Sequence, residues 1–260
     1  MTRIGKILVA TDFSPAANNA MSYAVQLAEQ TDQDMVVMYV HKEGESDRDI
    51  KTKFEQIEHD FMYGRGIDCL FDTRVGSVIS AIQEAVRDYD IDIMIIGTRG
   101  FEGLKEMQIG SLTADLIDNP TFPVISIPKY CRNLEFNHIA LASDFAEIDQ
   151  NSALRMVYEL ASLCDSDLKI VHVNTHSEPV SPMVRNQLDT IFSVVPHDYY
   201  ELEGDSVVDG LLQFCESEPV DLLVTLRKKF KDSSKMMSGS ISKQLSLRGK
   251  VPLMVIPTQN

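Results

Sequence analysis

The sequence predicts an α/β fold made of two tandem doubly wound domains, each a five-stranded parallel sheet flanked by helices, Rossmann-like in topology. Three observations lead to this prediction: the chain repeats itself, short apolar runs alternate with amphipathic segments, and those segments carry helix start signals. Its 260 residues suit one large domain or two smaller ones, so length alone does not decide. The repeat favours two domains.

Matches in the same order relate the first half of the sequence to the second. Residues 7–14 read ILVATDFS, and residues 139–146 read IALASDFA. Later, GSLT faces GSIS, and the apolar segment PVISIP faces PLMVIP. Ordered matches of this kind indicate a duplicated unit. We therefore predict domains at residues 1–129 and 138–260, joined through the segment KYCRNLEFN.

The apolar runs of the first unit predict strands at Lys6–Ala10, Met35–His41, Cys69–Arg74, Ile91–Gly97 and Pro123–Ile127. The segment Pro15–Gln30 has apolar residues at helical spacing, and Ser14 with Pro15 forms a typical helix start. Further helices are predicted at Ser77–Asp88, Leu112–Asp118, Asn151–Cys164 and Ser206–Glu216. Because strands and helices alternate, each sheet is expected to be parallel, with ligands at the carboxyl ends of its strands.

Charge, cysteine spacing and the N-terminal segment argue against several classes of protein and partner. The net charge is −15 and both halves are acidic, which argues against nucleic acid and anionic membranes as partners. The four cysteines are far apart and lack the spacing of a disulfide framework or a zinc site. The N-terminus enters a strand pattern directly, without the apolar core of a signal peptide, so we expect a cytoplasmic protein.

Residues 97–111, GTRGFEGLKEMQIGS, contain the clearest candidate site. Gly97 ends a predicted strand, and Gly97 and Gly100 are expected to let the backbone approach a ligand closely and adopt positive φ. Gly110 and Ser111 precede a predicted helix, whose free N–H groups favour an anion, with hydroxyl donors from Ser111 and Thr113. Asp12 follows the first strand and is a candidate for a ribose hydroxyl or a metal-bound water. Taken singly, each of these residues is also typical of an ordinary turn or helix cap.

The spacing G-x2-G-x9-G-[S/T], met by Gly97, Gly100, Gly110 and Ser111, resembles the ATP-binding motif of the universal stress protein family. The opening KILVATDFSPAANNAMSYAVQLA resembles that family's first strand and helix, and the duplication resembles its tandem two-domain members. This resemblance implies a strand order of 3-2-1-4-5 and ATP, with a divalent metal such as Mg²⁺ supplied by the nucleotide. It also implies that the last strands of the two units pair antiparallel as an intramolecular pseudo-dimer; association into a homodimer stays open.

The same resemblance implies a role for each matching position. Residues around adenine and ribose would be Ala10, Thr11, Asp12 and Val40. Residues lining ribose and phosphates would be Gly97, Arg99 and Gly100, and those cradling the phosphates would be Gly110, Ser111, Leu112 and Thr113.

The second unit departs from this pattern. Leu226 and Lys229 stand where the first unit has Gly97 and Gly100, while Gly239 and Ser240 are kept. Its loop also carries several basic residues, RKKFK among them. The segment is interpreted as a degenerate site with solvated lysines, or alternatively as a site retuned for another anionic ligand or an acidic partner.

The function expected from the sequence is ATP binding in the N-terminal domain, used in a stress response or in signalling. No catalytic residue is assigned, because the loop offers no arginine finger and no evident water-activating base; Glu102 and Glu106 are interpreted as solvated. No protein metal ligand is assigned either. Two alternatives stay open: a scaffold that binds a partner or another ligand with little role for ATP, and a slow Mg²⁺-dependent ATPase.

Overall fold

A computed structural model describes residues 5–98, 111–144, 151–175, 182–228 and 240–258. These residues form strands β1 (Lys6–Thr11), β2 (Met35–His41), β3 (Cys69–Val75), β4 (Ile91–Gly97), β5 (Val124–Ile127), β6 (His138–Ala142), β7 (Asp167–Asn174), β8 (His197–Glu203), β9 (Leu222–Lys228) and β10 (Leu253–Thr258). The helices are α1 (Pro15–Thr31), α2 (Asp47–Ile57), α3 (Val78–Tyr89), α4 (Ser111–Asp118), α5 (Asn151–Leu163), α6 (Pro182–Ile191), α7 (Val207–Ser217) and α8 (Ile241–Arg248). A short π-helix, Glu58–Met62, follows α2.

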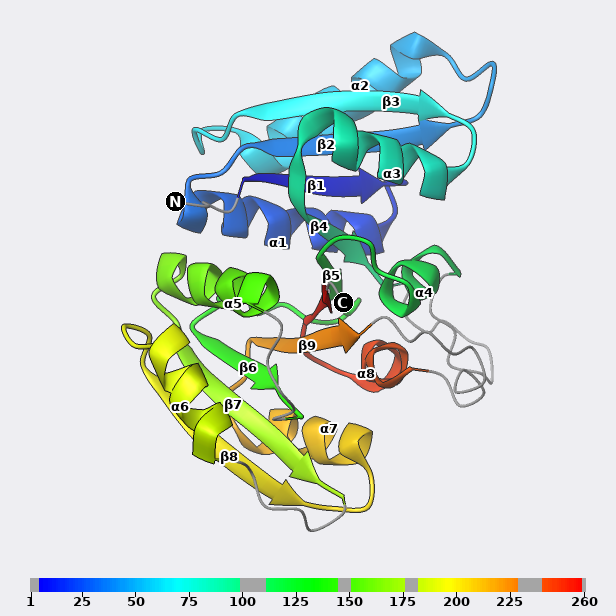
Figure 1. The fold of residues 1–260 in the computed structure, drawn as a ribbon. Helices are drawn as coiled ribbons and strands as arrows, with labels where there is room; N and C mark the ends of the chain where they lie inside the picture. The colour runs from blue at the N-terminus through cyan, green and yellow to red at the C-terminus, as the bar shows by residue number, and fades with distance from the viewer. Residues whose placement is uncertain (1–4, 99–110, 145–150, 176–181, 229–239, 259–260) are drawn as a thin grey trace.

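All ten strands belong to one sheet, in the order β3-β2-β1-β4-β5-β10-β9-β6-β7-β8 (Figure 1). Each half therefore has the expected order 3-2-1-4-5, and neighbouring strands within each half are parallel. The halves meet where β5 and β10 pair antiparallel, with Ile125 opposite Met254. The expected α/β fold with two Rossmann-like halves and an antiparallel junction is confirmed.

Local signals explain why α1 begins and ends where it does. The hydroxyl oxygen of Ser14 accepts a hydrogen bond of 3.2 Å from the N–H of Ala17, and Pro15 occupies the first turn, where its missing N–H costs nothing. Asp32 ends the helix in the left-handed conformation with φ 54°. Because α1 buries Met21, Tyr23 and Leu27, it packs along the sheet as predicted.

Successive side chains of each strand point to opposite faces of the sheet, and helices pack on both faces. On one face, Ile7 and Val9 pack with residues of α1, α2, α5 and α6 in a single cluster that runs through both halves. On the other face, Leu8 and Met38 pack with α3 and α4, and a further cluster packs with α7 and α8. Strands buried on both faces are typical of a doubly wound sheet.

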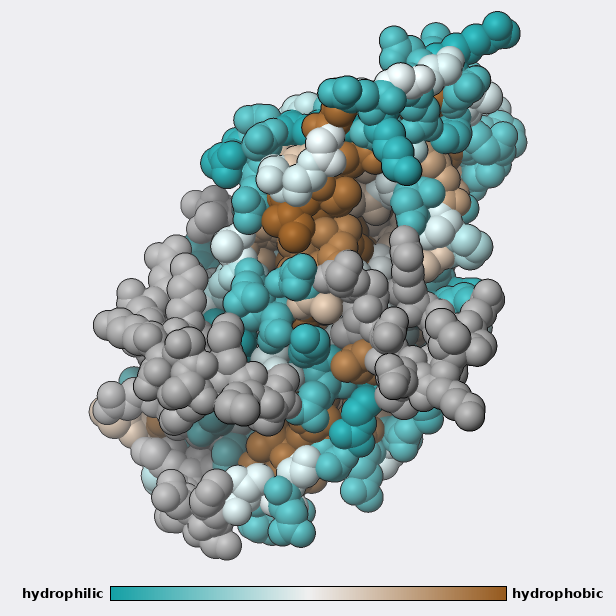
Figure 2. All heavy atoms as spheres, turned by 90° about the vertical axis from the view of Figure 1, so that its right-hand side faces the viewer, coloured by the Kyte–Doolittle hydropathy of each residue, from teal (hydrophilic) through white to brown (hydrophobic). Residues whose placement is uncertain are grey.

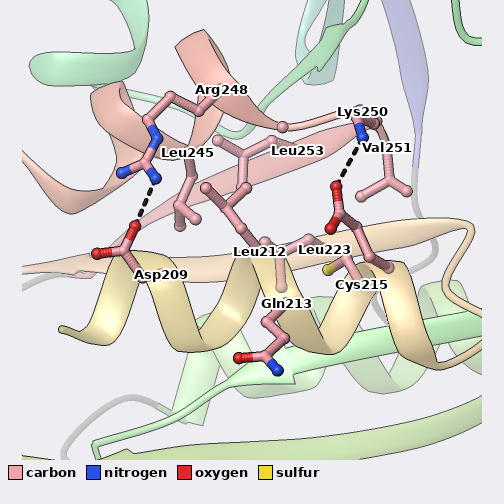
Figure 3. A pocket seen from close by; sticks show the side chains of 12 residues that line it. Asp209, Leu212, Gln213, Cys215, Leu223, Leu245, Arg248, Lys250, Val251 and Leu253 are labelled. Atoms are coloured by element: carbon pink, nitrogen blue, oxygen red, sulfur yellow. Dashed lines mark hydrogen bonds and ion pairs between the residues drawn. The ribbon is translucent and has the colours of Figure 1, made fainter. Parts of the chain in front are cut away.

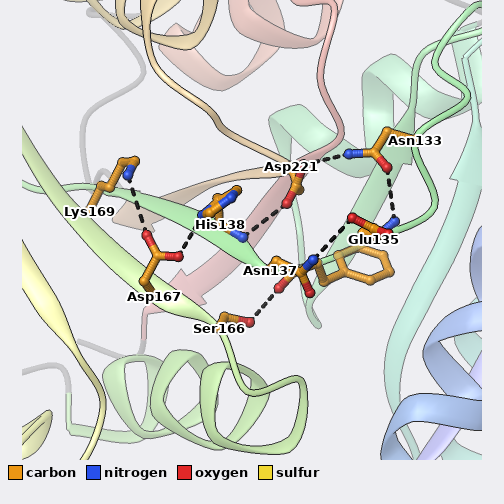
Figure 4. Close-up of polar contacts among 9 residues, drawn as sticks. Asn133, Glu135, Asn137, His138, Ser166, Asp167, Lys169 and Asp221 are labelled. Atoms are coloured by element: carbon orange, nitrogen blue, oxygen red, sulfur yellow. Dashed lines mark hydrogen bonds and ion pairs between the residues drawn. The ribbon is translucent and has the colours of Figure 1, made fainter.

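The connection between the halves is packed rather than loose (Figure 4). The side chain of Asn133 donates to the carboxylate of Asp221 over 2.6 Å, and the same carboxylate accepts from the N–H of His138 over 3.0 Å. Phe136 is fully buried, and its carbonyl accepts a hydrogen bond from Ser166. On the other side, Asn19 of α1 donates to the carbonyl oxygens of Pro128 and Cys131. These contacts hold the connecting segment to both halves.

Candidate functional site

The carboxyl ends of β1 and β3 point toward one side of the molecule, as the arrowheads in Figure 1 show. Figure 2 views the molecule from that side and shows an apolar area exposed over the N-terminal half. In a doubly wound sheet this edge holds ligands, next to the point where β1 separates β2 from β4. The residues at that point are therefore the candidate site.

Three predicted residues gather on the α3 and α4 side of the sheet. Ala10, Val40 and Leu112 are all partly buried and pack against the same apolar cluster. Ala10 is near the end of β1, Val40 near the end of the neighbouring β2, and Leu112 in the first turn of α4. Each leaves part of its apolar surface accessible on this side of the sheet, and such surface suits a flat, apolar group such as a nucleobase.

The turn between β1 and α1 is held by its own side chains. The hydroxyl oxygen of Thr11 accepts from the N–H of Phe13 over 2.9 Å, and a carboxylate oxygen of Asp12 accepts from the N–H of Ser14 over 3.0 Å. Phe13 has φ 61°, a left-handed conformation that is uncommon for a residue of this size. Thr11 is buried and Asp12 is exposed, so this turn presents one oriented carboxylate two residues after Ala10.

The structure corrects the reason for a glycine at position 97. Its φ is not among the positive values of the described glycines, which are those of Gly44, Gly64, Gly66 and Gly76. A β-carbon at Gly97 would instead meet the carbonyl oxygen of Ala16 at 2.3 Å. The expectation of positive φ is therefore wrong, and at this position the glycine serves the packing of α1 against β4.

Thr113, an expected phosphate contact, makes a hydrogen bond within the protein. It is buried, and its hydroxyl donates to the carbonyl oxygen of Gly97 over 3.3 Å. This hydrogen bond links the first turn of α4 to the end of β4. What α4 presents at this edge is its N-terminus, which begins at Ser111 and favours negative charge.

Three predicted site residues, Arg99, Gly100 and Gly110, lie outside the described residues, and of Ser111 only the backbone position is described. The described part of the site is thus Ala10, Thr11, Asp12, Val40, Gly97, Leu112 and Thr113.

The corresponding edge of the C-terminal half is built differently. Leu226 takes the place of Gly97 and packs on the α5 side of the sheet. A guanidinium nitrogen of Arg227 lies 3.8 Å from one carboxylate oxygen of Asp118, and the ammonium of Lys243 lies 3.5 Å from the other. Asp118 ends α4 of the N-terminal half, so a carboxylate of one half engages cations of the other. Ser240 accepts from the N–H of Lys243 over 3.1 Å and caps α8.

A cavity of about 330 Å³ lies between α7 and α8 (Figure 3), and the sequence did not predict it. Leu223 and Leu253 lie at its base, and ion pairs Asp209–Arg248 and Glu216–Lys250 flank it. The thiol of Cys215 lines it as well, and burial raises the pKa of this thiol to about 12. At neutral pH the thiol is therefore protonated and a poor nucleophile.

No group of three or more His, Cys, Asp or Glu side chains in the described ranges lies close enough together to hold a metal ion. Within the same ranges, each helix is too short or too polar to cross a membrane.

Comparison with known proteins relates the N-terminal half to one family. Residues 3–128 match the model of the Universal stress protein family. Universal stress protein Sll1388 from Synechocystis sp. is 25% identical over 149 residues, which cover 47% of this chain and 97% of that protein.

Two solved structures share the fold of the whole chain. A universal stress protein from Archaeoglobus fulgidus has a TM-score of 0.78 at 18% identity, and the match covers 97% of this chain and 98% of that one. A protein of unknown function from Pseudomonas aeruginosa has a TM-score of 0.70 at 14% identity, covering 97% of this chain and 92% of that one. The fold of the whole chain thus recurs in other proteins.

Proposed function

We propose that the N-terminal half, which carries the Universal stress protein match, binds ATP together with Mg²⁺ and serves a cytoplasmic stress response or signalling. The observation that carries this proposal is the gathering of three chemically distinct features at one edge of the sheet. Ala10, Val40 and Leu112 offer an apolar surface, Asp12 offers a carboxylate, and α4 offers a helix N-terminus. A nucleotide consists of an apolar base, a hydroxyl-bearing sugar and an anionic phosphate chain, so it complements all three.

The proposed contacts follow from this arrangement. Ala10 and Val40 would contact the adenine ring, and Asp12 would accept a hydrogen bond from a ribose hydroxyl. The phosphates would lie at the N-terminus of α4, where the backbone of Gly110 and Ser111 and the side chain of Arg99 complete the motif. Mg²⁺ would be bound by the phosphates and neutralise part of their charge.

We propose further that the C-terminal half does not bind ATP in this way. Lys229 stands at the position of the motif glycine Gly100 in that half, and Arg227 and Lys243 are engaged by Asp118. Of the basic residues that suggested a second anion site, Arg227 is thus partly neutralised within the protein.

The test begins with the ligand that the purified protein carries. Mass spectrometry of small molecules released on denaturation should find adenine nucleotide, and titration calorimetry with Mg²⁺ should give one ATP per chain. A Gly100→Val, Gly110→Val variant should lose binding, because bulky β-branched residues would crowd the phosphate backbone contacts. Gly239→Val in the second half is the matched control and should still bind one ATP.

Contrary results would distinguish the rival functions. A wild-type protein with no released nucleotide and no calorimetric binding would contradict the proposal and favour the scaffold. Phosphate release that is lost in the Gly100→Val, Gly110→Val variant would instead indicate a slow ATPase that uses this site.

A further inference from the structure

Four side chains form a closed ring of contacts beside the turn that carries Asp12. The rings of Phe13 and Tyr39 meet edge to face, with centroids 4.7 Å apart. The Tyr39 hydroxyl donates to the Glu45 carboxylate over 2.9 Å, and that carboxylate accepts from the Lys53 ammonium over 2.8 Å. The ammonium closes the ring, because it lies 5.1 Å from the centre of the Phe13 ring and 5.3 Å from that of Tyr39. We call these four residues the Lys53 clamp.

The clamp joins segments that are distant in the sequence. Phe13 is in the turn after β1, Tyr39 is in β2, Glu45 lies between β2 and α2, and Lys53 is in α2. Tyr39 stands opposite Thr11 in the register of β1 and β2. The Phe13 ring is held from a further side by Phe54, with centroids 5.9 Å apart. The clamp and Phe54 together therefore hold the ring of Phe13 from several directions.

The ionisation of the clamp is consistent with these contacts. The hydrogen bond to Lys53, followed by that from Tyr39, lowers the pKa of Glu45. The same bond to Glu45 raises the pKa of Lys53, while burial and then the Glu45 contact raise the pKa of Tyr39. At neutral pH the ring thus holds one carboxylate, one ammonium and a neutral phenol.

Phe13 connects this ring to the candidate site. Its left-handed conformation is unfavourable for a residue with a β-carbon, and contacts around it must hold it. Its backbone N–H is bound by Thr11, and the next N–H is bound by Asp12. If Phe13 relaxes, the Asp12 carboxylate turns with the chain.

The C-terminal half supplies an internal comparison. His172 occupies the place of Tyr39 there, and its Nδ1 lies 2.9 Å from the carbonyl oxygen of Ser143. The half that has Leu226 in place of Gly97 therefore also lacks the phenol of the clamp. The clamp and the intact glycine pattern occur together in the N-terminal half.

We propose that Lys53 is a positioning residue that, through Phe13, holds the Asp12 carboxylate in the orientation that binds a ribose 2′-hydroxyl. This inference rests on the proposed function, since it assigns part of the same site. It makes the N-terminal half selective for ribonucleotides over deoxyribonucleotides, although Lys53 itself touches neither.

The test compares ATP with 2′-deoxy-ATP by titration calorimetry in the presence of Mg²⁺. Wild type should bind ATP about tenfold more tightly, the value of one well-placed hydrogen bond to a charged group. Lys53→Met should weaken ATP binding about tenfold and leave 2′-deoxy-ATP binding nearly unchanged, so that the preference disappears. Lys53→Arg keeps a cation over the rings of Phe13 and Tyr39, so this variant should retain the preference for ATP over 2′-deoxy-ATP. Lys51→Met is the matched control, because Lys51 lies on the same helix and its exposed ammonium is 3.8 Å from the Glu55 carboxylate.

The outcomes separate the two proposals. If wild type binds no adenine nucleotide, the proposed function and this inference both fail. The inference alone fails in two cases, both with wild type binding ATP. In one, wild type shows no preference for ATP over 2′-deoxy-ATP; in the other, Lys53→Met keeps that preference. The proposed function stands in both cases. A folding defect in Lys53→Met would instead weaken the binding of both nucleotides alike. A second variant, Glu45→Gln, removes the partner charge of Lys53. It should also lose the preference for ATP over 2′-deoxy-ATP if the inference is right.

Discussion

The carbonyl oxygen of Ala16 lies 2.3 Å from the point that a β-carbon at Gly97 would occupy. The first turn of α1 is therefore seated directly on the end of β4. Since Thr113 hydrogen-bonds to the carbonyl of Gly97, three elements converge on this one residue. The packing of α1, β4 and α4 against one another depends on the absence of a side chain here.

Replacing Gly97 by alanine should destabilise the protein even without nucleotide. A β-carbon cannot coexist with the Ala16 carbonyl, so α1 or β4 must shift, at a cost of about 1–3 kcal/mol. Thermal unfolding of the ligand-free protein measures this. Gly204→Ala is the control, because a β-carbon there meets only Val173 at 3.8 Å. An unchanged melting temperature for Gly97→Ala would mean that this glycine is required by the ligand alone.

Asn19→Ala should loosen the connection between the halves. The Asn19 amide donates to the carbonyl oxygens of Pro128 over 3.1 Å and Cys131 over 3.2 Å, and its own oxygen accepts from Arg132 over 2.6 Å. Leaving such partners unsatisfied costs about 1–3 kcal/mol. Urea unfolding should show the loss, whereas Asn18→Ala, one residue earlier and less buried, should have a smaller effect. Equal effects of the two variants would contradict this role for Asn19.

Asp118→Asn should weaken the contact between α4 and the C-terminal half in a salt-dependent way. The carboxylate is 24% exposed and faces Arg227 and Lys243, so we expect a loss of up to about 1 kcal/mol at low salt and less at high salt. Melting temperatures at the two salt concentrations measure it. Asp115→Asn, an exposed position on the same helix, serves as the control. A loss that does not change with salt would argue against an ion pair.

His197 should make stability depend on pH near neutrality. Burial opposes its protonation, but the Val195 carbonyl and the Asp189 carboxylate outweigh burial and raise the pKa of His197 above 6.5. The folded state therefore binds the proton more tightly than the unfolded state. This stabilisation is fully present below pH 6.5 and is lost as the pH rises through the raised pKa.

The measurement is the free energy of unfolding of wild type and His197→Gln across this range. The advantage of wild type should shrink as the pH rises. An advantage that grows with pH would contradict the raised pKa.

Features encoded by neighbouring residues were predictable, and contacts between distant segments were not. The start of α1 followed from Ser14 and Pro15, and the strand order followed from the family resemblance. The role of Gly97 could not be foreseen, because its reason is the carbonyl of Ala16, far away in the chain. Nothing in the spacing of Phe13, Tyr39, Glu45 and Lys53 indicates that they form one ring of contacts.

The pairing of β5 with β10 has a consequence for the two halves as a unit. Both strands belong to one chain, so this junction forms without a second molecule, and its strength does not depend on protein concentration. Two separate subunits would lose translational freedom on association. The covalent connection removes this cost, because the two halves are already held together. A symmetric pair would also have to change both copies together, whereas here Leu226 can replace glycine in one half while Gly97 is kept in the other.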